Sequence, residues 1–266
     1  MDYVRFQHLF QAEGLRLGQA AVTDMDAPVP SCPGWTVADV VRHSVLMYTG
    51  AAGQLRPEQR PVAHNARPGA GSAHPVTNSS TKGDLLDTYN RAHAALVTEM
   101  ARRDPLDPIE GEALDPGVAD GVDGDGPDPG TAGFLVRRMA REAAVHRADI
   151  EMAVGTPGPL DAQQALDGID EVLGVLLPAH YDGGTRDGAS GRTIGVHSNR
   201  HHWRLTMQRS GVTMSRDRGF ADAAVSGEPA ELLLYLWGRR PGTVVSQTGD
   251  RSVLAAFRRR LAASMV

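Results

Sequence analysis

The sequence predicts a bundle of four long helices in its N-terminal part, followed by a smaller α+β domain. The first prediction rests on apolar residues that recur at helical spacing in four segments within residues 1–158. The second rests on short alternating runs after the Gly- and Pro-rich stretch GTPGPLDA, which are typical of strands joined by tight turns. We therefore expect the α+β domain to occupy residues 159–266.

The first helix is expected at about residues 4–22 and the second from about residue 37 onward. Thr36 is a suitable N-cap for the second helix, with Asp39 at the third helical position, where a carboxylate reaches back to the cap. The inward face of the first helix would consist of Phe6, Leu9, Phe10 and Leu17.

The third helix is expected at about Lys82–Arg102 and the fourth at about Thr131–Val154. The connecting segments 56–80 and 104–130 are rich in Pro and Gly, which predicts long irregular connections. The seam of the third helix would consist of Leu86, Tyr89, His93, Leu96 and Met100.

The α+β domain shows one hairpin pattern and two strand-to-helix patterns. Trp203, Leu205 and Met207 alternate along one run, and the chain is expected to turn at about Ser210 before the run resumes. Pro229 follows Gly-Glu and is expected in the first turn of an apolar helix. The stretch TVVSQTGDRSVLAAFRRRL predicts a further strand, turn and helix.

Composition excludes several classes of protein. The net charge of −5 over 266 residues argues against a nucleic-acid surface. No apolar run approaches the ~20 residues of a membrane helix, and the single Cys32 excludes an intramolecular disulfide. We expect a cytoplasmic protein, a monomer or small homo-oligomer, whose partners are small molecules.

Two polar residues interrupt the apolar stripe of the fourth helix. Glu142 and His146 are four residues apart, so both side chains lie on one face. A buried ion pair between them is one interpretation, but desolvation makes it costly without further hydrogen bonds. The other interpretation is a pair of metal ligands. The rest of the stripe is Leu135, Met139, Ile150 and Ala153.

A third ligand is available on the second helix. His43 falls in the same sector as Val40, Leu46 and Met47, so it is expected to face the bundle interior. With Glu142 and His146 it supplies two imidazoles and a carboxylate, the set that several hydrolytic zinc centres use. The sequence lacks the His-Glu-x-x-His motif, so it indicates no general base and no catalytic residue beside the ligands.

Three segments of the chain resemble a known family. VPSCPGWTVADVVRHS and REAAVHRADIEMAVG are similar to the two signatures of the mycothiol-dependent maleylpyruvate isomerase family, whose N-terminal domain is a DinB-like metal-binding bundle. SGEPAELLLYLWGRR resembles the family's small second domain. The resemblance implies a divalent metal, usually Zn²⁺, on His43, Glu142 and His146. It also implies mycothiol as a cosubstrate.

The implied chemistry begins with a thiolate. A free thiol has a pKa of about 8.5, and coordination to zinc deprotonates it. Attack on a small electrophile gives an S-transferase, whereas addition to and elimination from a double bond gives cis-trans isomerisation, as in maleylpyruvate isomerase itself. A metal- or thiol-binding module without turnover and a metal-hydroxide hydrolase are the alternatives from other classes.

One arginine is implied as a substrate contact. The family's arginine in its C-terminal Gly-Arg segment corresponds to Arg239, and capping of a helix C-terminus is the structural alternative for this residue. The segment VTNSSTKGDLL contains no match to the family's other substrate arginine, which favours an electrophile other than maleylpyruvate. Three further residues are expected to have packing roles: His93 in the core or a pocket wall, Cys32 as a small buried hydrophobe and Trp35 as an anchor.

Overall fold

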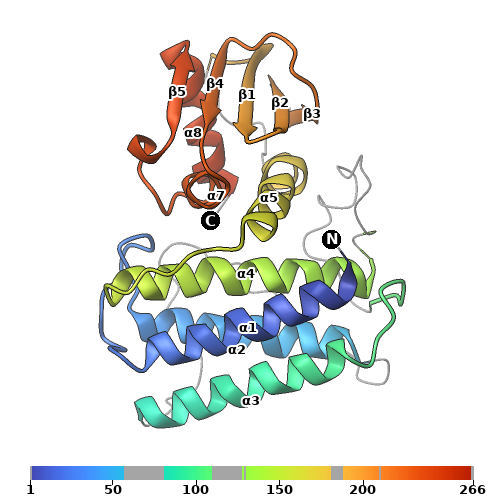
Figure 1. Cartoon of the computed structure of the whole chain (residues 1–266), viewed down its shortest axis with the longest axis vertical. Helices are drawn as coiled ribbons and strands as arrows, with labels where there is room; N and C mark the ends of the chain where they lie inside the picture. Colours follow the sequence, from blue (N-terminus) through green and yellow to red (C-terminus); the bar gives the residue numbers. More distant parts are fainter. Residues whose placement is uncertain are drawn as a thin grey trace. The chain divides into compact units, whose positions relative to one another are not determined.

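The computed structural model describes residues 2–56, 81–109, 128, 130–180, 188–209 and 211–264. These residues form two compact units, one ending at Gly158 and the other beginning at Pro159 (Figure 1). The predicted connections 56–80 and 104–130 lie largely outside the described residues. No helix within the described ranges has the length and apolar character needed to cross a membrane.

Four long helices form the described part of the N-terminal unit. Their starts fall within two residues of the predicted ones, and so do the ends of α1, α3 and α4, because the apolar spacing and the capping residues agree along the chain. The second helix extends to Gln54, beyond the apolar stretch ending at Tyr48 that predicted it. Thr36 precedes the second helix and Asp39 accepts hydrogen bonds from its backbone N–H and hydroxyl, at 2.9 and 2.7 Å, as predicted. The helices are α1 (Tyr3–Ala21), α2 (Val37–Gln54), α3 (Lys82–Met100) and α4 (Ala132–Ala153).

The contacts between helix ends fix the directions of the helices. The Tyr3 hydroxyl, at the start of α1, donates to the carbonyl of Met100 at the end of α3, at 3.0 Å. Arg16 in α1 pairs with Glu151 near the end of α4, at 3.2 Å. Helices α1 and α4 therefore run in one direction, while α2 and α3 run in the opposite direction (Figure 1).

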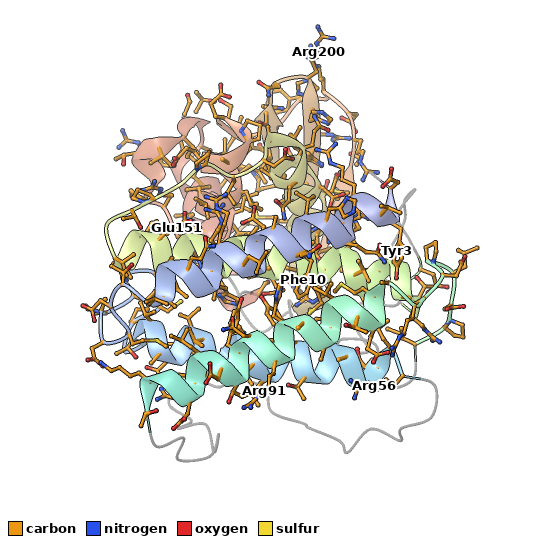
Figure 2. All side chains as sticks on the ribbon, turned by 60° about the horizontal axis from the view of Figure 1, so that its bottom comes forward. Tyr3, Phe10, Arg56, Arg91, Glu151 and Arg200 are labelled. Carbon is orange, nitrogen blue, oxygen red and sulfur yellow. The ribbon has the colours of Figure 1, made fainter. Side chains whose placement is uncertain are left out.

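The interior of this unit is aromatic. Phe10 is fully buried and meets Tyr48 edge-to-face with ring centroids 4.9 Å apart, while His93 lies 5.0 Å from Phe10. Figure 2 shows Phe10 between α1 and α3, and Arg91 on the outer side of α3. The prediction that His93 is a core residue is confirmed, since its side chain is buried.

The predicted inward faces need two corrections. Leu46 is 37% exposed, so the inward sector of α2 is narrower than its apolar residues indicate. Leu86 is only half-buried, and the neighbouring Leu85 takes the buried position instead. Short apolar clusters leave the rotation of a helix uncertain by one position, and packing against the neighbouring helices decides it.

Helix α1 is joined to α4 by buried charges. The guanidinium of Arg147, which is fully buried, pairs with Glu13 of α1 and with Glu151 of its own helix. The carboxylate of Glu151 also accepts the Gly158 N–H at 2.8 Å. A buried guanidinium is tolerated only when its N–H groups are paired, so this network fixes the register between the two helices.

The second unit contains a five-stranded sheet and helices. The sheet order is β3-β2-β1-β4-β5, in which only β1 and β4 pair in parallel. The strands are β1 (Arg192–Ser198), β2 (His201–Gln208), β3 (Gly211–Ser215), β4 (Ala223–Ser226) and β5 (Ser246–Gly249). The helices are α5 (Ala162–Glu171), η2 (Val172–Leu176), α6 (Leu177–His180), α7 (Pro229–Leu236), η3 (Gly242–Val244) and α8 (Arg251–Ser264).

The predicted β2–β3 hairpin is confirmed, and Trp203, Leu205 and Met207 lie on the buried face of the sheet. They belong to a core that includes Leu173 before the sheet and Phe257 on α8. The predicted fold class, a helical N-terminal part followed by a smaller α+β part, is confirmed. The segment α5–α6 and strand β1 were not predicted as separate elements.

Helix α7 begins and ends as its sequence dictates. Pro229 occupies the first turn, as predicted. At the other end Gly238 has φ of +74°, its N–H donates to the Tyr235 carbonyl, and the Arg239 N–H donates to the Leu234 carbonyl at 2.7 Å. These two bonds form a Schellman motif, which satisfies carbonyls that the helix end leaves open.

We expect Gly238→Ala to destabilise the protein by about 1 to 2 kcal/mol, because an L-residue with a Cβ is strained in the left-handed region. Urea denaturation followed by circular dichroism measures the change. Gly50→Ala is the matched control, since Gly50 lies inside α2 with open space around its Cβ position and should instead stabilise the helix. Equal effects of the two substitutions would contradict the role of Gly238.

Candidate functional site

The loop before α2 positions the first candidate ligand. The Cys32 N–H donates to Val29, and the Trp35 N–H donates to Cys32, around Gly34 with φ of +85°. The turn places the Trp35 ring against His43, with centroids 5.5 Å apart and planes at 61°. The anchoring role predicted for Trp35 thus includes contact with a candidate ligand. Cys32 itself is half-buried, less than predicted.

The structure brings the three predicted ligands together. The rings of His43 on α2 and His146 on α4 meet edge-to-face with centroids 4.9 Å apart. His146 Nε2 lies 3.4 Å from the carboxylate of Glu142. Glu142 and His146 are both buried, as the interrupted stripe predicted.

A chain of polar groups orients His146 from its other side. Its Nδ1 lies 3.2 Å from a carboxylate oxygen of Asp149, and the other oxygen accepts the hydroxyl of Ser31 at 2.6 Å. Asp149 is fully buried, so these bonds compensate a charge that water does not reach. A carboxylate on Nδ1 leaves Nε2 as the nitrogen that faces Glu142 and His43.

The charges of the site are set by mutual pairing. Burial alone would raise the pKa of Glu142, but Arg138, at 3.1 Å, together with His146 and His43 lowers it to about 2. Burial alone would lower the pKa of His146, but its bonds to Asp149 and Glu142 raise it to about 9. The site therefore holds an ionised carboxylate beside an imidazole that accepts a proton readily.

The donor atoms suit a divalent ion such as zinc. Two tetrahedral ligands with zinc distances of about 2.0–2.1 Å lie roughly 3.4 Å apart, and the His146 Nε2 to Glu142 Oε2 distance is 3.4 Å. His146 Nε2 is buried, and within the described residues its contact with Glu142 is an ion pair without the alignment of a hydrogen bond. Across the described ranges, however, no three His, Cys, Asp or Glu side chains are arranged so that they could hold a metal ion. His43, Glu142 and His146 thus match zinc in the chemical type of their donor atoms, and the pair His146 and Glu142 also matches it in spacing.

Arg239 lies in the other unit, at the end of α7. Its guanidinium donates to the Trp237 carbonyl at 2.9 Å and lies over the Trp237 ring, 5.4 Å from the centroid. The carbonyl belongs to the C-cap of α7, so this bond is the helix-capping alternative that the sequence offered. Its role as a substrate contact stays a prediction.

Sequence reasoning missed the residues that support the ligands. Asp149 follows His146 by three positions, a spacing that brings side chains together on a helix and was a readable signal. Arg138 precedes Glu142 by four positions and was equally readable. No sequence signal indicates Ser31, because its contact joins the loop before α2 to α4.

Comparisons with known proteins identify the family. A family model described as the mycothiol maleylpyruvate isomerase N-terminal domain matches residues 9–151, and the MDMPI C-terminal domain model matches residues 163–256. The chain belongs to the mycothiol-dependent maleylpyruvate isomerase family, as its resemblance predicted. Comparison with curated proteins finds no match.

Solved structures agree with this fold. A crystal structure of the mycothiol-dependent maleylpyruvate isomerase matches with a TM-score of 0.58 and 11% identity, covering 93% of each chain. A histidine-to-alanine mutant of that enzyme matches with a TM-score of 0.56 and 10% identity, again over 93% of each chain. At this identity the likeness shows the fold alone.

In the metal-free protein we expect His146 to make stability depend on pH. Its pKa is raised from 6.5 to about 9 in the folded state, so its contribution is fully present below pH 6.5 and is lost as the pH rises toward 9. The difference in unfolding free energy between the metal-free wild type and His146→Gln should therefore shrink over this range. Urea denaturation at each pH, after chelator treatment, measures it. A difference that stays constant from pH 6 to 10 would contradict the pairing.

Proposed function

We propose that the protein is a metal- and thiol-dependent enzyme of the transferase or isomerase type. One observation carries the proposal: the ring of His43 from α2 meets that of His146 from α4, whose buried Nε2 lies 3.4 Å from the carboxylate of Glu142. Family membership supports mycothiol as the thiol. Two imidazoles and one carboxylate leave a coordination position open, which a catalytic site requires.

Each residue of the site has a definite task. A divalent ion, Zn²⁺ by its donor set, would supply the Lewis acidity that keeps the cosubstrate thiol ionised. Asp149 holds the His146 ring so that Nε2 faces the other ligands. Arg138 keeps Glu142 ionised. Trp35 packs on His43 and limits the rotation of its ring.

The reaction would begin with the sulfur of the thiol cosubstrate. The thiolate attacks an electron-poor carbon of a small substrate and forms a C–S bond. If a leaving group departs with the bonding pair, the product is an S-conjugate. If the substrate is an activated cis double bond, rotation and elimination of the same thiolate give the trans isomer and regenerate the thiol. Both outcomes share the first step, so one site serves either.

We favour transfer to an electrophile other than maleylpyruvate. The sequence offers one arginine for a dicarboxylate, Arg239, and this residue donates to the Trp237 carbonyl. An electrophile with less negative charge needs fewer arginines. Maleylpyruvate isomerisation proper is the second candidate, and it is supported by the family to which the chain belongs.

His43→Ala and His146→Ala should each abolish stoichiometric metal, because each removes one of three ligands. Elemental analysis of purified protein measures the metal, and circular dichroism checks that the variants fold. His8→Ala is the matched control: His8 is an exposed histidine of α1 and its loss should leave the metal content unchanged. Full metal occupancy in both His43→Ala and His146→Ala would contradict the proposed metal site.

Turnover should require both the thiol and the metal. We expect mass spectrometry to detect a sulfur conjugate when the metal-loaded protein is incubated with mycothiol and a panel of electrophiles that includes maleylpyruvate. The conjugate should be absent without thiol and with His146→Ala.

The other outcomes separate the alternatives. Isomerised maleylpyruvate without a conjugate would favour the isomerase. A product formed without thiol would favour a metal-hydroxide hydrolase. Thiol binding without any product would favour a binding module.

A further inference from the structure

Two histidines of the second unit face each other across the β1–β2 hairpin. The hairpin turns through Asn199 and Arg200, with Asn199 at φ of +51°, so His197 pairs with His202 in the antiparallel register. Arg200 extends from the tip of this hairpin in Figure 2. Directly opposed residues have Cβ atoms about 4.5–5.5 Å apart, and their side chains lie on the same face of the sheet. The Nδ1 atoms of the two rings are 3.0 Å apart.

Neighbouring residues limit the space around the two rings. The His197 ring lies over Gly195, where a Cβ would be only 2.7 Å from Nε2, so a larger residue at this position would displace the ring. Nε2 of His202 is buried and makes no hydrogen bond with the residues that the structure describes. Both rings lie on the face opposite the apolar core, since Val196 and Trp203 point into that core.

The charges around the pair favour neutral imidazoles. Partial burial and the nearby Arg218 lower the pKa of His197, and burial with Arg218, His197 and His201 lowers that of His202. Neutral imidazole is the form that coordinates metal. Hard cations such as Mg²⁺ are held mainly by charge, so the positive charge of Arg218 disfavours them strongly. Ions that bind through nitrogen donors are disfavoured less.

The 3.0 Å distance between the two Nδ1 atoms matches two ligands that bind one ion at a right angle to each other. Two nitrogens, each about 2.1 Å from one ion and at 90° to each other, lie about 3.0 Å apart, whereas tetrahedral ligands lie about 3.4 Å apart. We propose that His197 and His202 form a second metal site, for a late first-row divalent ion with tetragonal geometry such as Cu²⁺ or Ni²⁺. Water would complete the coordination shell, because within the described part of the chain no third His, Cys, Asp or Glu joins the pair in a metal-holding arrangement.

The competing explanation is a hydrogen bond between the rings. An N–H···N bond also spans about 3.0 Å, and one Nδ1 would then carry a proton. The two explanations differ in what added metal does. A hydrogen-bonded pair without affinity for metal leaves copper uptake unchanged when either ring is removed.

Equilibrium dialysis of the full-length protein against Cu²⁺, followed by elemental analysis, tests the site. We expect His197→Gln and His202→Gln each to bind one copper ion fewer than wild type. His201→Gln is the matched control: it lies on the same hairpin, but its ring stacks on Trp203, 6.0 Å between centroids, and its uptake should equal that of wild type. The histidines of the helical unit are unchanged in all three variants, so the result is independent of the proposed enzyme site.

A second measurement needs no variant. Substoichiometric Cu²⁺ is paramagnetic and should broaden the ring NMR signals of His197 and His202 before that of the exposed His8. Equal copper uptake by wild type, His197→Gln and His202→Gln would overturn the proposal, as would broadening of His8 first.

Discussion

The burial of charge along α4 is the constraint on which the helical unit depends. This helix places Arg147, Asp149 and Glu142 in the interior, where an unpaired ion costs several kcal/mol. Each is therefore matched by a charge or a hydrogen bond from a fixed direction: Glu13 from α1, Ser31 from the loop before α2, and Arg138 one turn earlier. Because Glu13 and Ser31 come from segments separate from α4, the helices assemble in one register only. The candidate ligands occupy their positions as a consequence of that register.

The sequence was sufficient where local rules decide the structure. The N-cap at Thr36, the start of α7 at Pro229 and the shared face of Glu142 and His146 depend on spacing within one element, and the structure agrees. It was insufficient where packing decides. Leu46 and Leu86 are apolar but are not buried, and strand β1 contains Gly195, a weak strand residue over which the His197 ring lies closely. Spacing within one segment does not reveal which of these residues are buried, because burial depends on contacts with other helices and strands.

The Gly-Arg segment after α7 is held in place by the hydrogen bonds that end the helix. Gly238 ends the helix in the left-handed conformation, and the Arg239 N–H completes the motif. The backbone at position 239 is therefore held by two hydrogen-bonded turns, while its long side chain lies over Trp237. A side chain attached to so rigid a base loses less conformational freedom when it binds an anion, since its first atoms are already ordered.

The directions of the helices in the first unit have a topological consequence. Since α2 and α3 are parallel neighbours, the start of α3 lies about the length of α2 away from the end of α2, roughly 27 Å for 18 residues. A connection between two ends so far apart can vary in length at little cost, because the entropy of closing a loop grows only with the logarithm of its length. The packing of the four helices therefore does not depend on the exact number of residues that join α2 to α3.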